Sequence, residues 1–217
     1  MLCCLKFLYG GRSSSANVAM KMNQNNIQLD TANMGHEVVI LKNGCRICGS
    51  GGALATAPLV QSKSYFEVKL QQSGHWSIGL ATHKTDLNKS KGGTDTESWC
   101  LNSDHIVLHN NTEIHKLSLQ PADISSSLEN INDVLPGTNH ETGIPAEGDT
   151  IGVAYDHVEM NFYLNGKKLD IPTLSIKGTV YPALFVDDGA ILDIILDDFN
   201  FGPPPGFDKI MLEQSLL

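Results

Sequence analysis

The sequence predicts an all-β protein, a bent antiparallel β-sandwich with a flexible N-terminal tail and one long exposed loop. Short segments alternate apolar with polar residues, and turn signals separate these segments at regular intervals. No amphipathic helix of usual length interrupts this pattern, which argues against an alternating α/β fold. At 217 residues and 41% hydrophobic content, the chain can bury the core of one domain.

The N-terminal residues predict a tail rather than part of the core. Residues 10–26 are rich in Gly, Ser and Asn and have no periodic apolar face, so we expect a flexible tail over 1–26 and a folded domain over 27–217. The start, MLCCLKFLY, is too short for a secretory signal and carries Lys6. Its adjacent thiols, Cys3 and Cys4, are accessible candidates for acylation, and two acyl chains suffice for membrane attachment. The alternative is a terminus without function.

The predicted strands then follow in order. An apolar run and a second short run flank Asn43-Gly44, a dipeptide typical of a two-residue type I′ hairpin turn. The same form recurs on either side of Ser73-Gly74, in KSYFEVKLQQ and HWSIGLAT. Further strands are expected in HIVLHNN, GDTIGVAYD, MNFYLNGKKL, TVYPALFV and AILDIILDDF. The C-terminal residues 208–216 leave room for a helical turn or two.

Residues 117–147 interrupt the rhythm of strands. They are rich in Ser, Asn, Pro, Thr and acids and contain only isolated apolar positions. A segment of this length is uncommon as a structureless connection inside a compact domain. We therefore expect an exposed, partly disordered loop with little effect on the core.

The cluster formed by Asp156, His157 and Glu159 resembles an acid-base or metal-binding group. On a straight strand only His157 and Glu159 would share a face, whereas a zinc site needs at least three protein ligands. If the segment is a turn, Asp156 can bond its own backbone two residues on, and the other two side chains face water. The turn is the favoured interpretation.

Cys45 and Cys48 form a lone C-x-x-C motif. Zinc ribbons need a second pair of ligands, and a redox C-x-x-C belongs at the start of a helix. Here the motif lies on a predicted strand, where positions three apart face opposite sides. A structural strand is the stronger interpretation, because a metal site would have to recruit Cys3 and Cys4 across the tail.

The remaining motifs give only weak indications of a binding or catalytic site. The run GSGG at 49–52 lacks the residues of a phosphate-binding loop and fits a bulge or tight turn. His105 and His109 would align only on a helix, but HIVLHNN is typical of a strand. No nucleophile motif is present. We expect no catalytic residue, no metal and no cofactor, and hence no enzyme.

Charge and cysteine usage indicate the compartment and the kind of partner. The chain has 15 basic and 24 acidic residues, a formal charge of −9, and no basic run that could follow a phosphate backbone. Nucleic acid is therefore an unfavourable partner and a basic protein surface a better one. Five scattered cysteines are typical of a reduced, cytoplasmic protein. We expect a monomer, with membrane contact only through the tail.

Several of these segments together resemble the SPRY domain family. The motifs are SYFEVKL, HWSIGLAT, GDTIGVAYD, MNFYLNG, VYPALFV and DFNFGPPPGF, and their order and spacing match over residues 36 to about 212. The resemblance implies a bent sandwich of two antiparallel sheets that binds proteins through loops at one end. It also implies that Trp76 to Gly79 and Gly148 to Asp156 are mainly framework.

The resemblance further points to one loop as the partner-binding site. SPRY relatives that carry a SOCS box present Val-Trp-Gly there to an acidic, Asn-rich peptide. This sequence has Asp187, Asp188 and Gly189 at the matching positions, so the aromatic platform is replaced by two carboxylates that favour a basic segment. The leading hypothesis is a non-enzymatic adaptor. The alternatives are a carbohydrate-binding, lectin-like sandwich and, behind it, a zinc hydrolase.

Overall fold

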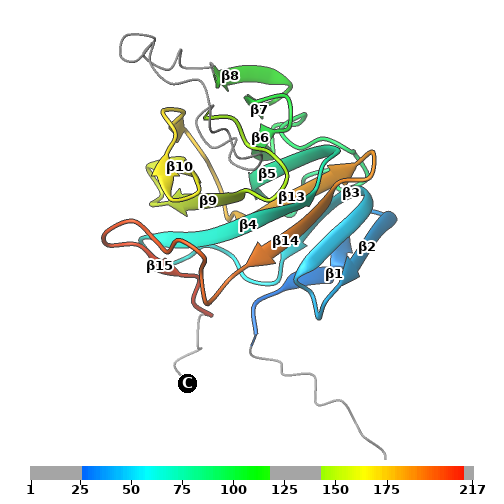
Figure 1. Cartoon of the computed structure of the whole chain (residues 1–217), viewed down its shortest axis with the longest axis horizontal. Helices are drawn as coiled ribbons and strands as arrows, with labels where there is room; N and C mark the ends of the chain where they lie inside the picture. Colours follow the sequence, from blue (N-terminus) through cyan, green and yellow to red (C-terminus); the bar gives the residue numbers. More distant parts are fainter. Residues whose placement is uncertain (1–25, 118–142, 213–217) are drawn as a thin grey trace, which may run out of the picture.

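The computed structural model describes residues 26–117 and 143–212, and within them it contains strands and turns but no helix. Two curved sheets, antiparallel except for one short parallel pair, pack face to face, as Figure 1 shows. The all-β, bent-sandwich prediction is therefore confirmed. The predicted tail with Cys3 and Cys4, and residues 118–142 of the predicted 117–147 loop, lie outside the described residues.

The strands divide into two hydrogen-bonded groups that share β3. Sheet A contains β1 (Leu29–Met34), the second half of β3 (Arg46–Ala55), β13 (Tyr181–Asp187), β5 (His75–Ala81), β6 (Ser98–Asn102), β7 (Ile106–His109) and β8 (Thr112–Lys116). Sheet B contains β2 (Glu37–Leu41), the first half of β3, β14 (Ile191–Ile195), β4 (Ser64–Gln72), β9 (Thr150–Tyr155), β10 (Glu159–Leu164), β11 (Lys167–Lys168), β12 (Thr173–Leu174) and β15 (Asp208–Lys209).

The glycine run at 49–52 lets β3 pass from one sheet to the other. Residues 46–50 pair with β2 in sheet B, and residues 51–54 pair with β13 in sheet A. Gly51 has a φ of 122°, and a Cβ there would lie 2.8 Å from the carbonyl oxygen of Leu87. Only glycine fits that conformation and that close approach. The expected bulge or tight turn is thus a bend within a long strand.

The interpretation of β4 and β5 as a hairpin is wrong. The two strands flank Ser73-Gly74 as predicted, but β4 pairs with β14 and β9, whereas β5 pairs with β13 and β6. The turn therefore carries the chain across the sandwich. Alternation of apolar and polar residues shows which side chains of a strand face the core, but it does not show which strand pairs with it. The sequence therefore could not distinguish a hairpin from a turn that crosses between the sheets.

The core lies between the sheets and is filled by the alternating residues that predict the strands. From sheet B, Phe66, Val68 and Leu70 point inward, and from sheet A Ile78 and Leu80 do so, each at most 1% exposed. Burying an aliphatic or aromatic side chain of this size contributes roughly 1.5–3 kcal/mol.

Three local expectations differ from the structure. Leu41 pairs with Arg46, so the connection of β2 to β3 has four residues, 42–45, and is not a two-residue type I′ turn. Lys42, Asn43 and Gly44 all have positive φ. Helical turns were expected over 208–216; in the described part of that range, 208–212, there is no helix, and β15 pairs in parallel with β4. The strands β1, β6 and β8 were not foreseen, and in β1 the sequence LDTANM has little alternation.

Candidate protein-interaction site

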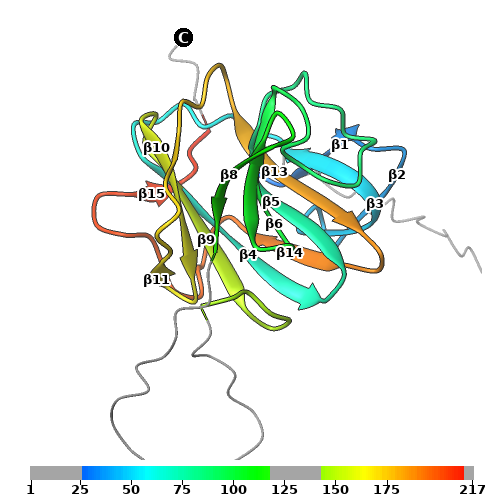
Figure 2. The ribbon, with the colours of Figure 1, turned by 90° about the horizontal axis from the view of Figure 1, so that it is seen from above.

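Two turns that cross between the sheets lie side by side at one end of the sandwich. One is Ser73-Gly74, between β4 and β5, and the other is Asp188-Gly189, between β13 and β14 (Figure 2). A Cβ at Gly74 would lie 2.6 Å from the carbonyl oxygen of Asp188, so the two backbones are in direct contact. The Gln72 side chain donates a hydrogen bond of 2.9 Å to the carbonyl oxygen of Gly189. Each turn therefore braces the other.

The predicted binding loop, Asp187 to Gly189, adopts a tight left-handed turn. Asp188 and Gly189 have φ values of 49° and 81°, and the Ala190 N–H donates to the Asp187 carbonyl oxygen at 3.0 Å. Consecutive positive φ angles with this bond are typical of a type I′ turn, which favours Gly at the second position. Asp187 is half-buried opposite His75 on β5, while Asp188 is exposed. The turn thus presents the Asp188 carboxylate on a rigid frame.

Further acidic side chains surround the same end. The Glu147 carboxylate accepts a hydrogen bond of 2.9 Å from the Ser73 N–H, next to the crossing turn. Asp104, after β6, forms an ion pair with Lys91. The hydrogen bond from Lys91 lowers the pKa of Asp104, and the nearby His75 adds to this effect. The end therefore carries more carboxylates than cations and can accept hydrogen bonds from lysine or arginine side chains.

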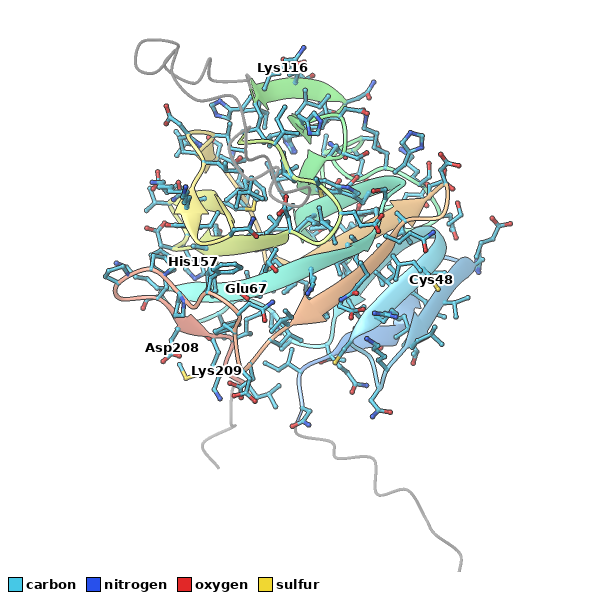
Figure 3. The ribbon with its side chains drawn as sticks, viewed as in Figure 1. Cys48, Glu67, Lys116, His157, Asp208 and Lys209 are labelled. Carbon is cyan, nitrogen blue, oxygen red and sulfur yellow. The ribbon has the colours of Figure 1, made fainter. Side chains whose placement is uncertain are left out.

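The Asp156 group lies at the opposite end and forms the expected turn. The Asp156 carboxylate accepts hydrogen bonds from the backbone N–H groups of Val158 and Glu159, at 3.0 and 2.9 Å. His157 is exposed, as expected, whereas Glu159 is partly buried, and both side chains also have partners in the fold. His157 Nε2 lies 2.9 Å from the Gln61 carbonyl oxygen, and Glu159 accepts a hydrogen bond from an asparagine of its own strand. Figure 3 shows His157 at this end, far from Cys48.

The cysteine motif is split between a turn and a strand. Cys45 is exposed in the 42–45 turn, and only Cys48 lies on β3, as a partly buried free thiol. Cys48 Sγ lies 3.7 Å from the carbonyl oxygen of Val39. Within the described ranges, no group of three or more His, Cys, Asp or Glu side chains could hold a metal ion.

Of the three histidines near β7, His109 packs against the fold. HIVLHNN contains the predicted strand, and His105 lies in the turn that precedes it. The His109 ring stacks on Trp99 with centroids 4.5 Å apart and planes 7° apart, and its Nδ1 lies 2.9 Å from the Ser98 carbonyl oxygen. His115, on β8, is partly exposed.

The sequence reasoning missed a buried carboxylate, Glu67 on β4 (Figure 3). Although 0% exposed, it accepts hydrogen bonds from the N–H groups of Asn200, Phe201 and Gly202 at 2.7–3.0 Å, and from the Tyr65 hydroxyl at 2.9 Å. Burial, with the charge of Glu67, raises the pKa of Tyr65, which therefore stays a donor. The available signal was a lone acid in the apolar strand SYFEVKL.

Comparison with known proteins identifies the class of the chain. The model of the SPRY domain family matches residues 63–198, and the chain belongs to that family. The family is generally one of protein-interaction modules rather than enzymes. Full-length relatives are named SPRY domain-containing protein 7. The human protein is 45% identical over 216 residues, covering 100% of this chain and 97% of its own, and the Bos taurus protein is 44% identical with the same coverage.

Solved structures support the same fold at low sequence identity. The SPRY domain of human HERC1 has a TM-score of 0.54 at 14% identity and covers 79% of this chain and 99% of its own. The TRIM65 PSpry domain has a TM-score of 0.53 at 12% identity, covering 78% and 89%. These likenesses show the fold alone. In the part of the chain that the structure describes, no helix is long and apolar enough to cross a bilayer.

Proposed function

We propose that the protein is a non-enzymatic adaptor that binds a basic segment of a partner protein through the end of the sandwich that carries Asp187, Asp188 and Gly189. The observation that carries this proposal is the rigid display of the Asp188 carboxylate on a turn held by Gln72 and Gly74. A preorganised loop loses little conformational entropy on binding. Acidic side chains at such a site increase the association rate and select against acidic partners.

The chemistry of this end separates the protein from SPRY relatives that bind an acidic, Asn-rich peptide. Glu147 and Asp104 add carboxylates near the crossing turns, and Lys91 offsets one of them. An acidic peptide would meet like charges here, whereas a lysine- or arginine-rich segment would gain charge-assisted hydrogen bonds. The partner class that we expect is therefore a basic, extended segment.

A peptide array tests this proposal. Wild-type protein should be retained by peptides rich in lysine and arginine, and the double reversal Asp187→Lys with Asp188→Lys should lose that retention. The control reverses two exposed acids elsewhere, Asp170→Lys with Glu113→Lys, which changes the net charge by the same amount. Equal loss in both variants, or no loss in the first, would show that the loop is not the site.

We further propose that the N-terminal thiols attach this adaptor to membranes after acylation, from an otherwise cytoplasmic location. The support is compositional: Cys3 and Cys4 are adjacent and flanked by apolar residues, and two acyl chains give stable attachment. Replacing both with serine should move the protein from the membrane to the soluble fraction, while the control Cys45→Ser should not. An unchanged distribution in the double variant would rule out this attachment.

A further inference from the structure

The connection between β14 and β15 contains three consecutive prolines, Pro203, Pro204 and Pro205, and the chain has no other pair of adjacent prolines. A proline ring fixes φ at about −65°, and it also excludes the helical region for the residue before it. Pro203 and Pro204 are therefore confined to the extended, polyproline II region. Residues 202–204 accordingly belong to no strand or turn.

A tight turn continues this geometry through Pro205. The Phe207 N–H donates a hydrogen bond of 3.1 Å to the Pro204 carbonyl oxygen, and Gly206 has a φ of 85°. Proline followed by a glycine of positive φ at the two central positions is typical of a type II turn, in which the first central residue is also extended. Pro203 to Pro205 thus form one turn of polyproline II helix, a conformation without internal hydrogen bonds.

The fold holds both ends of this polyproline segment in place. On its N-terminal side, the buried Glu67 carboxylate accepts hydrogen bonds from the N–H groups of residues 200–202. On its C-terminal side, Lys63 Nζ lies 5.2 Å from the centroid of the Phe207 ring, and β15 pairs with β4. A segment fixed at both ends loses little conformational entropy when a partner binds it.

The polyproline segment is on the surface of the molecule. Pro203 and Pro205 are exposed, Pro204 is half-buried, and the nearby Phe201 is 51% exposed. Both views show the connection between β14 and β15 projecting at the margin of the molecule, on the side opposite the turn between β13 and β14 (Figures 1 and 2). The prolines therefore form a surface separate from the 187–189 loop.

We propose that residues 201–205 form a second interface, which docks into a groove lined by aromatic side chains on a proline-recognition domain of a partner protein. Aromatic rings pack against exposed proline rings, and this mode of binding selects a preformed polyproline II segment. The carbonyl oxygens of such a segment can also accept hydrogen bonds from tryptophan or tyrosine in the groove, except that of Pro204, which is used in the turn. This inference goes beyond the binding proposed for the 187–189 loop, because two separate interfaces allow one adaptor to hold two proteins together.

Purified domains of the SH3, WW and EVH1 types, which bind proline-rich segments through aromatic grooves, are the probes for this interface. Each domain is immobilised and titrated with the folded full chain up to about 1 mM, the weak end of the affinity scale. At least one domain should bind the wild type. Pro203→Ala with Pro205→Ala should weaken that binding at least about tenfold, because the variant loses two exposed rings and the restriction on φ. The matched control, Pro58→Ala with Pro172→Ala, removes two isolated, half-buried prolines and should bind like the wild type.

Two further measurements separate this interface from a structural effect and from the loop site. On binding, amide NMR signals should shift at Gly202, Gly206 and Phe207. The variant with Asp187→Lys and Asp188→Lys should bind the same domain as tightly as the wild type does, so the two interfaces are tested independently. Circular dichroism checks that each variant is folded. No binding of any domain type up to about 1 mM, or binding that the alanine variant leaves intact, overturns the proposal.

Discussion

The Glu67 side chain is on the outer face of β4, where a substitution usually has little effect on stability. Replacing Glu67 with glutamine should nevertheless destabilise the protein strongly. The buried carboxylate accepts hydrogen bonds from three consecutive backbone N–H groups, at Asn200, Phe201 and Gly202, and from the Tyr65 hydroxyl. It fastens the C-terminal segment over the outer face of sheet B. Glutamine has nearly the same shape, so the substitution changes the charge and one acceptor and creates no cavity.

The size of the effect follows from the contacts. Glu67 Oε1 accepts three of the hydrogen bonds and Oε2 accepts the one from Asn200. Glutamine can keep the first oxygen, but its NH₂ group then faces the Asn200 N–H, so one buried donor loses its acceptor. A hydrogen bond to a charged group contributes about 1.5–3 kcal/mol, and an unsatisfied buried donor costs about 1–3 kcal/mol. We expect Glu67→Gln to lower the free energy of unfolding by about 2–4 kcal/mol.

Urea denaturation measures this loss, and hydrogen exchange locates it at the three amides of residues 200–202. The control is Glu159→Gln, because Glu159 is only partly buried and its carboxylate accepts one side-chain hydrogen bond, from Asn161. That control should cost less than about 1 kcal/mol. A Glu67→Gln variant within about 0.5 kcal/mol of the wild type, with unchanged exchange at these amides, would refute the reasoning.

Three further predictions concern a charge, a thiol and a glycine. Burial alone would raise the pKa of Asp193, but hydrogen bonds from Arg46 and Lys42 hold this pKa below its usual value. The ionised Asp193 carboxylate therefore stabilises the fold above about pH 4, and this stabilisation is lost as the pH falls further. In thermal melts, Asp193→Asn should be less stable than the wild type at pH 7, and the difference should shrink towards about pH 3. Burial raises the pKa of the Cys100 thiol, so brief treatment of native protein with iodoacetamide should label Cys45 and spare Cys100 by mass spectrometry; equal labelling would contradict this. Gly74→Ala should cost about 1–3 kcal/mol in urea denaturation, because its φ is 148° and a Cβ would lie 2.4 Å from the backbone of the neighbouring turn.

The sequence predicted the positions of the strands better than it predicted which strands pair with each other. Alternation placed the strands around Phe66 and Ile78 correctly, because each such residue is buried and the period of a strand is two. Pairing depends on which strand lies beside which, and no local pattern encodes this. The crossing turn at Ser73-Gly74 was therefore mistaken for a hairpin.

The candidate site could be predicted only in part. The resemblance to SPRY domains located Asp187 to Gly189, but the bracing by Gln72 and the nearby Glu147 depends on contacts between residues far apart in sequence. Glu67 was missed for the same reason. Its strand position faces outward, and it becomes buried because residues 199–202 fold over it. Burial by a distant segment leaves no periodic signal.

Proximity labelling in cells tests the central claim most directly, that partner binding occurs through the 187–189 loop. The comparison is between the wild type, the variant with Asp187→Lys and Asp188→Lys, and the charge-matched variant with Asp170→Lys and Glu113→Lys. We predict that the wild type and the charge-matched variant label a common set of proteins with exposed basic segments, and that the loop variant loses that set at equal expression. The same labelled set in all three proteins would contradict the account.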